Sequence, residues 1–460
     1  MELFNTEKSL LEKIIFNILK MPPMRIILLG FLVIITVGGV LLSLPISSAN
    51  GEFTNFLDSL FTSTSATCVT GLVRFDTYTH WSWFGKALIL CLIQIGGLGF
   101  MTMAISVIAL TKKHIGINTR VVMQSSISAP QVGGIVKLTK KIFTGTAIIE
   151  GSGVVLLSFY FVPKMGIVKG IIYSIFHSVS AFCNAGFDLM GYQSQFTSLT
   201  NEADDWYFCV IIMLLIIIGG LGFIVWFDLI ETRFNFKKLK LQSKIVLITS
   251  GLLIVIGAVG IFIFETKGIL FKDMPMNEKI LASLFQSVTA RTAGFNSVDL
   301  AGLTDSSKCM MIILMFIGGS TGSTAGGLKV TTFAVLILVV FSTIRNRKYL
   351  EIFKRRIEDG LGRTAACLFT IYMLISIISS IIICHIENIS MMDAVFECVS
   401  AIATVGLTLG VTPNLCKISE VIVMILMMLG RLGSVTVLMA LFADNNKVSP
   451  KYAQEKIQIG

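Results

Sequence analysis

A short pattern of hydroxyl and other small residues that closes on a glycine occurs four times along this chain. The copies run from Phe61 to Gly71, Phe176 to Gly186, Phe285 to Gly294 and Phe396 to Gly406, with the closing glycines 115, 108 and 112 residues apart. Four equivalent segments of a membrane protein can surround one axis, and backbone carbonyls around an axis replace the water shell of a dehydrated cation. The repeat therefore indicates an ion pore within one polypeptide.

The residues that lead into each glycine are the candidate ion ligands. Backbone carbonyls supply oxygens without a competing charge, and glycine adopts the positive φ that turns successive carbonyls to one side. Threonine hydroxyls in three segments are further possible ligands. The predicted filter residues are Cys68, Val69, Thr70, Gly71, Cys183, Asn184, Ala185, Gly186, Thr292, Ala293, Gly294, Thr404, Val405 and Gly406. One such segment alone would indicate an ordinary small-residue helix contact, so the prediction depends on the repetition.

An unusual glycine-rich stretch interrupts the apolar run that follows the third segment. It consists of Gly318, Gly319, Ser320, Thr321, Gly322, Ser323, Thr324, Ala325, Gly326 and Gly327. Glycine and hydroxyl residues are poor helix formers, and non-helical backbone at membrane depth must be buried in protein or line a wet cavity. We expect a polar loop that gates the pore below the filter. A kinked helix is the alternative.

Several polar side chains fall within the apolar segments. A charged residue inside a span usually has a partner. Arg431 is expected to donate hydrogen bonds to carbonyls of the 318–327 loop or to place its charge in the ion path, and we expect no acid within the neighbouring spans. Lys329 either acts in the same way or marks the cytoplasmic end. Arg291 is expected behind the filter against an acid, with Glu397 as a possible partner, and His177 is interpreted as polar packing.

Two weaker patterns accompany the four segments. Glycine clusters follow each of them, at Gly96-Gly-Leu-Gly-Phe100, Gly219-Gly-Leu-Gly-Phe223, Gly318-Gly-Ser320 and Gly430-Arg-Leu-Gly433. We expect close helix packing at these glycines and a wide cavity below the filter. Acids in the outer loops either concentrate cations at the mouth or are simply solvated. They are Asp188, Asp204, Asp205, Asp299 and Asp305.

The elements that would hold these segments are apolar helices. The 460 residues are 54% hydrophobic and only 14% charged, against roughly 25% charged in soluble domains. One apolar run precedes each segment (25–46, 142–162, 245–265, 365–386) and another follows it (84–110, 206–230, 309–342, 418–443). The predicted fold is an all-α integral membrane protein with four M1–pore loop–M2 repeats around a central pore, hence eight spanning helices.

The distribution of charge predicts the orientation. Loops 111–143, 231–244 and 343–364 carry 18 Lys and Arg but four acids, and the positive-inside rule places them in the cytoplasm together with both termini. This also explains the net charge of +10 without nucleic-acid binding. The predicted units are a cytoplasmic segment 1–23, repeats 24–110, 111–235, 236–344 and 345–443, and a cytoplasmic tail 444–460.

Taken together, these motifs resemble the Trk/Ktr/HKT superfamily of potassium transporters, and most closely the Ktr membrane subunit, over residues 20–443. Thr67–Leu72, Asn184–Phe187, Arg291–Asn296 and Thr404–Thr408 look like its filters, Ser320–Lys329 like its gating loop and Arg431 like its restraining arginine. The resemblance implies K⁺ uptake across a bacterial cytoplasmic membrane, Na⁺ as an activator and no covalent cofactor. It also implies a homodimer with one pore per protomer and a cytoplasmic ring of nucleotide-binding RCK subunits.

Two other classes of protein, a solute symporter and a membrane-embedded enzyme, are the alternatives to the ion pore. A sodium-coupled solute symporter would show two inverted repeats, whereas all inter-repeat loops here are basic and give each unit the same orientation. A membrane-embedded enzyme would need catalytic residues, and the spans contain no HExxH motif, paired carboxylates or Ser/His arrangement. The sequence leaves open whether transport is channel-like or coupled to Na⁺, and which nucleotide regulates it.

Overall fold

The computed structural model of the chain describes residues 21–99, 120–122, 124, 133–192, 194–272, 274–347 and 349–433. Several expectations fall partly or wholly outside these residues. They concern the N-terminal segment, most of the basic loop 111–143, the ends of the apolar runs 84–110 and 418–443, and the tail 444–460.

Helices form nearly all of the regular structure in the described residues. Those of 15 residues or more are α2 (Pro23–Ser43), α5 (Trp83–Leu98), α8 (Ile135–Met165), α9 (Ile167–Cys183), α10 (Trp206–Leu221), α12 (Leu241–Glu265), α15 (Val330–Ile344), α16 (Leu361–Glu387) and α18 (Lys417–Leu432). The others are α3 (Phe56–Cys68), α4 (Thr77–His80), α11 (Phe223–Glu231), α13 (Met276–Thr289), α14 (Asp305–Phe316) and α17 (Met391–Ile402). Short 3-10 turns are η1 (Pro45–Ser47), η2 (Met190–Tyr192), η3 (Thr200–Glu202), η4 (Phe236–Lys238) and η5 (Thr412–Asn414). A small antiparallel hairpin pairs β1 (Glu351–Ile352) with β2 (Arg355–Arg356).

Each predicted filter segment follows a short helix that packs against a longer one. The short helices are α3, α9, α13 and α17, and their partners are α2, α8, α12 and α16. Side-chain caps fix where two of the short helices begin, because Asn55 accepts from the amide of Leu57 and Ser390 accepts from that of Asp393. Such caps satisfy amides that lack a partner within the helix. These caps therefore fix the first residues of α3 and α17, the helices that lead into the first and fourth filter segments.

The long partner helices are the spans that the structure supports by length and composition. Four described helices, α2, α8, α12 and α16, are long and apolar enough to cross a membrane, and a fifth span results if α10 and α11, bent by 94°, are taken as one. The predicted count of eight is not reached on this criterion. The fold is thus mainly helical with four or five candidate spans.

Glycines explain why the second apolar run of each repeat is short. Gly99 (φ 81°) ends α5, Gly222 (φ 94°) separates α10 from α11, and Gly433 (φ 85°) ends α18. A helix cannot continue through such a backbone conformation, which favours glycine. The glycine-rich stretch separates α14 from α15 in the same place of the third repeat. The predicted runs 84–110, 206–230 and 418–443 are therefore interrupted at a glycine, and the interruption predicted within 309–342 is confirmed.

In three of the short helices, a serine contacts a glycine of the long partner helix and donates a hydrogen bond to a backbone carbonyl of that helix. Ser63, Ser178 and Ser287 donate to the carbonyls of Ile35 (2.8 Å), Glu150 (2.7 Å) and Ile254 (2.7 Å). A Cβ atom added to Gly38, Gly153 or Gly257 of the long helix would collide with the hydroxyl of that serine. The absence of a side chain at these glycines allows the two helices to approach closely.

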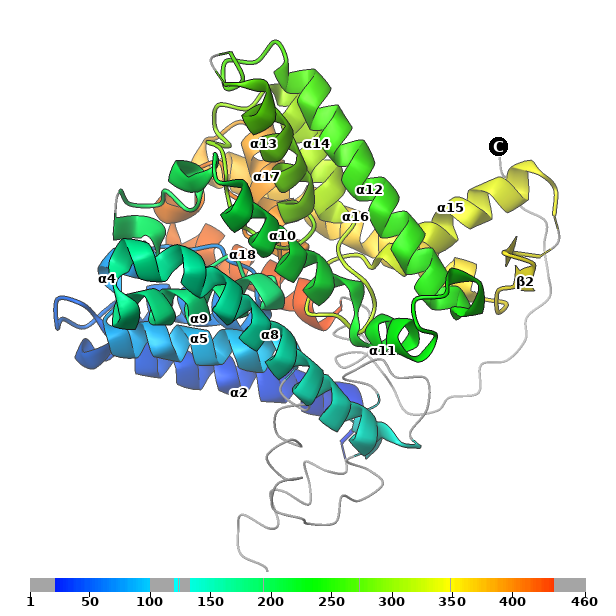
Figure 1. Cartoon of the computed structure of the whole chain (residues 1–460), viewed down its shortest axis with the longest axis horizontal. Helices are drawn as coiled ribbons and strands as arrows, with labels where there is room; N and C mark the ends of the chain where they lie inside the picture. Colours follow the sequence, from blue (N-terminus) through cyan, green and yellow to red (C-terminus); the bar gives the residue numbers. More distant parts are fainter. Residues whose placement is uncertain are drawn as a thin grey trace, which may run out of the picture.

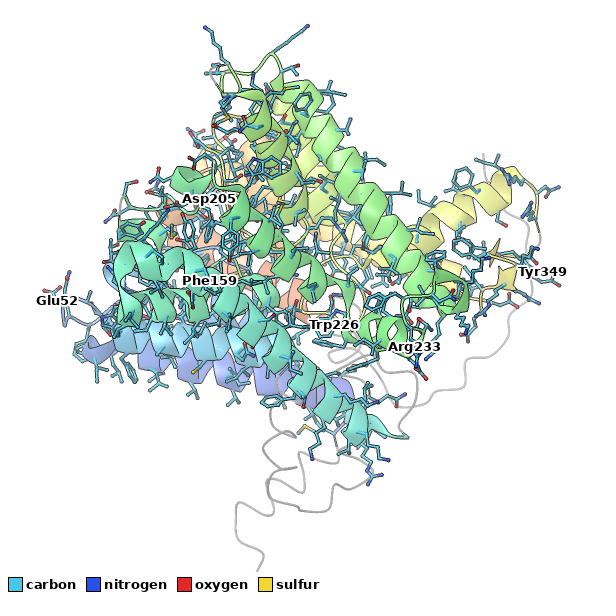
Figure 2. All side chains as sticks on the ribbon, viewed as in Figure 1. Glu52, Phe159, Asp205, Trp226, Arg233 and Tyr349 are labelled. Carbon is cyan, nitrogen blue, oxygen red and sulfur yellow. The ribbon has the colours of Figure 1, made fainter. Side chains whose placement is uncertain are left out.

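The helices are arranged so that the ends of the repeats fall on two sides of the molecule. In Figure 1, α2, α5, α8 and α9 form one group, while α12, α13 and α14 lie beside the group of α16, α17 and α18. Figure 2 shows Glu52 and Asp205, from predicted outer loops, on one side, and Arg233 and Tyr349, from basic loops, on the other. The arrangement agrees with the predicted common orientation of these loops.

Candidate functional site

The four closing glycines form a ring in the order of the sequence. A Cβ atom on Gly71 would lie 3.1 Å from the Cα of Gly186, one on Gly186 would lie 2.9 Å from that of Gly294, and one on Gly294 would lie 3.4 Å from that of Gly406. A Cβ atom on Gly406 would lie 2.9 Å from the Cα of Gly71, which closes the ring. Segments more than 100 residues apart therefore meet around one point.

Carbonyl groups separate neighbouring glycines of the ring. The same added Cβ atoms would meet the carbonyl oxygens of Ala185 (2.5 Å, from Gly71), Ala293 (2.7 Å, from Gly186) and Val405 (2.5 Å, from Gly294), and Gly406 faces the carbonyl of Thr70 in the same way. Each of these carbonyls belongs to the residue before a ring glycine. A side chain at any ring position would clash with the carbonyl of the next segment.

All four segments share one backbone shape. The residue two positions before each glycine has a positive φ, namely Val69 (57°), Asn184 (59°), Thr292 (77°) and Thr404 (52°), and the glycines also have positive φ. Non-glycine residues rarely adopt this region. It recurs at the same place in each of the four segments, which therefore share one local backbone conformation.

Hydroxyl groups behind the ring hold the segments in this shape. Ser65 and Ser400 accept hydrogen bonds from the amides of Gly71 and Gly406, each at 3.1 Å. In the other two segments, Ser180 donates to the carbonyl of Phe187 (2.6 Å) and Thr289 donates to that of Phe295 (2.7 Å). The sequence pattern contains these hydroxyls, but it does not reveal that they fasten the backbone of the filter segments.

The side-chain hydroxyls of the threonines predicted as ligands lack hydrogen-bond partners. The hydroxyls of Thr70, Thr292 and Thr404 are buried and have no hydrogen-bond partner among the described residues. Buried polar atoms normally have partners, and an unsatisfied one requires an explanation. Oxygens left open beside a ring of carbonyls fit a monovalent cation that has lost its water shell.

The two cysteines stay predicted filter residues through their carbonyls, while their side chains are buried in the protein. The thiols of Cys68 and Cys183 are buried, and the Cys183 thiol faces Gln94 at 3.5 Å and Glu150 at 3.9 Å. A Cβ atom on Gly97 would lie 2.6 Å from the Cys183 sulfur. The Cys183 side chain therefore packs against α5 and α8, and only its carbonyl is left as a possible ion ligand.

Glu150 was missed by the sequence reasoning. We expected no acid within the neighbouring spans, yet Glu150 lies in the middle of the predicted span 142–162 and is 9% exposed. It accepts from Gln94 Nε2 at 3.0 Å. A buried carboxyl group needs such a hydrogen-bond partner, and the bond fixes Gln94 and Glu150 relative to each other. The sequence did contain an indication of this residue, because Glu150 is the single acid in an apolar run, and an ionisable residue within a span is usually functional.

The glycine clusters after each segment pack against the short helices. A Cβ atom on Gly96, Gly219 or Gly430 would collide with the carbonyls of Thr67, Phe182 and Ile402, respectively, four residues before the ring glycines. The predicted close helix packing is confirmed for these three clusters, whereas in the third cluster Gly318 and Gly319 pack against Gly326 and Ala325 of the loop itself. The helix packing places the broken ends of α5, α10 and α18 directly beside the last turns of α3, α9 and α17.

The glycine-rich stretch 318–327 lies directly beneath two of the filter segments. Its backbone bonds to the broken end of α10, with Ser320 N donating to Gly220 O (2.9 Å) and Phe223 N donating to Gly322 O (2.8 Å). Thr324 Oγ1 donates to the carbonyl of Phe182 at 3.1 Å, and a Cβ atom on Gly326 would collide with the Thr404 hydroxyl. The stretch is a loop and not a kinked helix.

Arg431 joins this loop to the end of α5. Its guanidinium donates to the carbonyl of Thr324, to that of Gly96 and, at 2.9 Å, to that of Gly97. The expected hydrogen bond to a loop carbonyl is confirmed. No ion pair between described residues includes Arg431.

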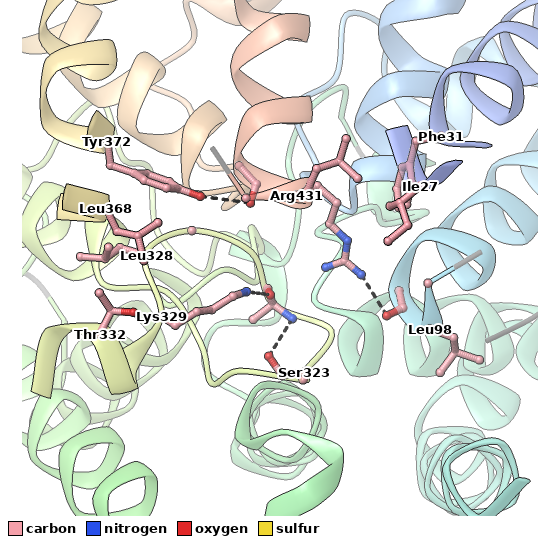
Figure 3. Close-up of a pocket in the computed structure, with 18 of the residues that line it drawn as sticks. Ile27, Phe31, Leu98, Ser323, Leu328, Lys329, Thr332, Leu368, Tyr372 and Arg431 are labelled. Atoms are coloured by element: carbon pink, nitrogen blue, oxygen red, sulfur yellow. Dashed lines mark hydrogen bonds between the residues drawn. The ribbon is translucent and has the colours of Figure 1, made fainter. Parts of the chain in front are cut away.

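A cavity of about 200 Å³ lies on the side of the loop that Arg431 faces. Figure 3 shows Arg431 and Lys329 pointing into the space bounded by Ile27, Phe31 and Tyr372. Lys329 Nζ donates to the loop carbonyl of Ala325 at 2.7 Å, so it acts on the loop as Arg431 does. The described lining contains two cationic side chains and no acid.

The predicted partner of Arg291 is wrong. Arg291 donates to the carbonyl (3.2 Å) and hydroxyl (3.2 Å) of Ser250 and to the carbonyl of Gly318 (3.4 Å). Glu397 instead accepts from the hydroxyls of Thr408 and, at 2.8 Å, Thr412. Arg291 therefore connects α12 to Gly318, the first residue of the loop, through neutral oxygens. These partners lie 41 and 27 residues away in the sequence, so no local pattern around Arg291 predicts them.

Most of the outer-loop acids shape the backbone. Asp188, Asp205 and Asp299 accept from the amides of Met190 (2.9 Å), Phe208 (3.1 Å) and Ala301 (3.1 Å). Acids outside the predicted set form the ion pairs on this side, and among them Asp58 in α3 lies 2.6 Å from Lys417 Nζ and 3.4 Å from Arg74 Nε. His177 bonds to the carbonyl of Tyr173 at 2.8 Å and is buried, so its interpretation as polar packing is confirmed.

Comparisons with known proteins agree on one family. The model of the TrkH family, described as a cation transport protein, matches residues 30–449. The potassium/sodium uptake protein NtpJ of Enterococcus hirae is 38% identical over 96% of this chain and 98% of its own length. The Ktr system potassium uptake proteins B and D of Bacillus subtilis are 36% and 33% identical, each over 95% of this chain and 97% of their own. The crystal structure of the potassium transporter TrkH from Vibrio parahaemolyticus has a similar fold, with a TM-score of 0.69 at 18% identity, over 91% of this chain and 84% of that one.

Proposed function

Since the chain belongs to the Trk/Ktr superfamily of cation transporters and is similar to the Ktr B and D membrane subunits, we propose that it takes up K⁺ through the ring of Gly71, Gly186, Gly294 and Gly406. The observation that carries the proposal is the closed ring itself, with a carbonyl between each pair of glycines. The unpartnered hydroxyls of Thr70, Thr292 and Thr404 support it. Such oxygens replace the hydration shell of a cation without adding a fixed charge.

The proposed architecture has four repeats and eight membrane passages. In each repeat a long helix enters, a short helix leads to the ring, and a second helix returns, interrupted at a glycine. The repeated positive φ before each ring glycine supports this reading. The C-terminal ends of the four short helices face the ring, and each carries roughly half a negative charge, which favours cations over anions. A sodium-coupled solute symporter with two inverted repeats does not account for a four-membered ring.

The loop 318–327 is the proposed gate. It lies under Phe182 and Thr404 and is held by Arg431 and Lys329. The positive charges of these two residues also repel a cation that leaves the filter. When the loop moves, Arg431 loses its bond to Thr324 while its bonds to α5 can remain, so the arginine is suited to restrain the loop.

The proposed membrane orientation and partners rest on the positions of the basic loops and on the names of the related proteins. The basic loops that contain Arg233 and Tyr349 lie on one side (Figure 2), which supports a cytoplasmic position for them in a multi-pass protein of the bacterial cytoplasmic membrane. We infer a homodimer and a cytoplasmic RCK-type regulatory ring docked on these loops, since two of the relatives are named as parts of Ktr systems. Na⁺ is inferred as an activator, because NtpJ is named a potassium/sodium uptake protein.

Ion flux in liposomes tests the proposal. The purified protein should carry K⁺ and Rb⁺ much faster than Na⁺, and choline should not be carried. Uptake should be measured with an inward Na⁺ gradient, with equal Na⁺ on both sides and without Na⁺. Stimulation that needs Na⁺ but no gradient supports activation, whereas K⁺ accumulation driven by the gradient would establish coupling. Absence of K⁺ flux from correctly inserted protein would refute the function.

A further inference from the structure

Two lysines from neighbouring helices meet at one aromatic cluster. Lys86 is the fourth residue of α5 and Lys169 the third of α9, and these helices pack together (Figure 1). Lys86 Nζ lies 4.5 Å from the ring centroid of Tyr78 and 4.9 Å from that of Trp83. Lys169 Nζ lies 5.8 Å from the same Tyr78 ring and 5.5 Å from that of Tyr173. The two ammonium groups therefore share one tyrosine.

Neither lysine has an acidic partner. No ion pair between described residues includes Lys86 or Lys169. The carboxylate of nearby Asp76 accepts from three backbone amides and from the Thr79 hydroxyl. It supplies one negative charge for two ammonium groups and forms an ion pair with neither. Lys86 is nevertheless only 7% exposed. Burying an ammonium without an ion-pair partner is costly, and two ammonium groups that share one tyrosine ring repel each other.

Aromatic rings reduce this cost but cannot remove it. The π faces of Tyr78 and Trp83 attract the ammonium groups, yet they carry no net charge. An anion between the two lysines would neutralise the pair and accept hydrogen bonds from both. The geometry thus has three features of an anion site: two ammonium groups over one tyrosine ring, a buried cation with no ion-pair partner, and more positive than negative charge.

The surface beside this site is apolar. Ile167 and Val168 at the start of α9 are 70% and 74% exposed, and Ile171, Ile172 and Ile175 continue the exposed face along the helix. Trp83 and Phe84 of α5 are also exposed. In a bilayer, such a face contacts acyl chains, and tryptophan and tyrosine favour the level of the headgroups. A ligand that matches both parts has an anionic head and a hydrocarbon tail.

We propose that Lys86 and Lys169 bind the phosphate of an anionic phospholipid whose acyl chain lies along the exposed face of α9. The site is separate from the ring, the loop and the basic inter-repeat loops, and it does not depend on the proposed transport function. Because α9 leads directly to Cys183 and Asn184, a lipid bound there would brace the second filter segment. Basic pockets between membrane helices bind lipid headgroups in this manner.

Thermal stability of delipidated, purified protein tests the site. Phosphatidylglycerol should raise the Tm by about 3 °C or more beyond the effect of phosphatidylcholine. The double variant Lys86→Gln/Lys169→Gln should lose this difference. Lys308→Gln is the matched control, because Lys308 is also the fourth residue of a helix, α14, but makes no cation–π contact with a described aromatic residue. An equal phosphatidylglycerol effect in the double variant overturns the proposal, as does the same rise with inorganic phosphate alone, which would identify a site for free anions.

A second measurement needs no variant. A photoactivatable phosphatidylglycerol analogue should label wild-type peptides that contain residues 76–86 or 167–175, and excess phosphatidylglycerol should compete with it. Labelling confined to other peptides would contradict the site. The result stands even if the double variant fails to fold.

Discussion

The guanidinium of Arg431 donates a hydrogen bond to the carbonyl of Thr324, 107 residues earlier in the chain. The same guanidinium is held by the carbonyls of Gly96 and Gly97 at the end of α5. One side chain at the end of α18 therefore connects the loop 318–327 to the end of α5. This connection is the basis of the first two predictions.

Replacing Arg431 should release the loop. Arg431→Ala is expected to raise K⁺ flux per molecule severalfold, because the carbonyl of Thr324 loses its donor and can be satisfied by water in the adjoining cavity at little cost. Arg431→Lys should give an intermediate rate, since an ammonium keeps the charge but loses the planar fork. Uptake normalised to membrane-inserted protein measures the effect. A collapse in yield with no rise in rate would show that Arg431 serves the fold alone.

Shortening the loop should have a similar effect. Deleting Thr321–Ala325 removes the contacts to Phe182 and Arg431, while the ring glycines are untouched. We expect faster K⁺ flux with unchanged preference for K⁺ over Na⁺. Lower flux from a folded, inserted variant would argue against a gate.

The ring should not tolerate a side chain. Gly71→Ser places a Cβ atom 2.5 Å from the carbonyl oxygen of Ala185, so the carbonyls must shift and discrimination between K⁺ and Na⁺ should weaken. Gly51→Ser is the control, because Gly51 also has a positive φ (71°) but no atom within 4 Å of the added Cβ. Competition of Na⁺ with Rb⁺ uptake reports the selectivity. If both variants kept the selectivity of the wild type, the filter assignment would fail.

The glycine opposite Ser178 should matter for stability. Gly153→Ala puts a methyl group against the Ser178 hydroxyl, and overpacking of this kind costs about 1–3 kcal/mol. Gly151→Ala in the same helix meets no atom within 4 Å and should be neutral or slightly stabilising, since alanine favours helix by up to about 1 kcal/mol. In detergent, the Tm of Gly153→Ala should fall below that of the wild type, whereas the Tm of Gly151→Ala should stay the same or rise. Equal Tm values would contradict the close approach of α8 and α9.

His80 should make the outer face sensitive to acid. Burial is the main cause that lowers the pKa of its imidazole from 6.5, opposed by the charge of Asp58, and its ring stacks on Phe75 at 4.0 Å. The unfolded chain then binds a proton before the folded protein does. This contribution to stability is complete above about pH 6.5 and is lost as the pH falls toward the folded pKa. Melting curves between pH 7.5 and about 5 should show less loss for His80→Gln than for wild type, and identical slopes would exclude this role.

The sequence alone determined where the chemistry lies along the chain. The spacing of the four glycines located the segments that meet in the ring, and the run of glycine and hydroxyl residues located the loop, because such residues interrupt an apolar helix wherever they occur. The family followed from the same motifs. Even the carbonyl partner of Arg431 was predictable, since the nearby loop offered backbone oxygens. These features depend on residue type and local spacing.

The tertiary structure decided which residues touch across the repeats. Arg291 bonds to Ser250 and not to Glu397, the Glu150 carboxylate lies beside Cys183, and Gly153 makes room for Ser178. The expectation of uninterrupted second spans was also wrong at three places, because Gly99, Gly222 and Gly433 adopt positive φ values at which the helices end. Each of these outcomes depends on how helices distant in sequence pack at close range. Contacts of that kind are set by the packing of the whole molecule, and no local pattern encodes them.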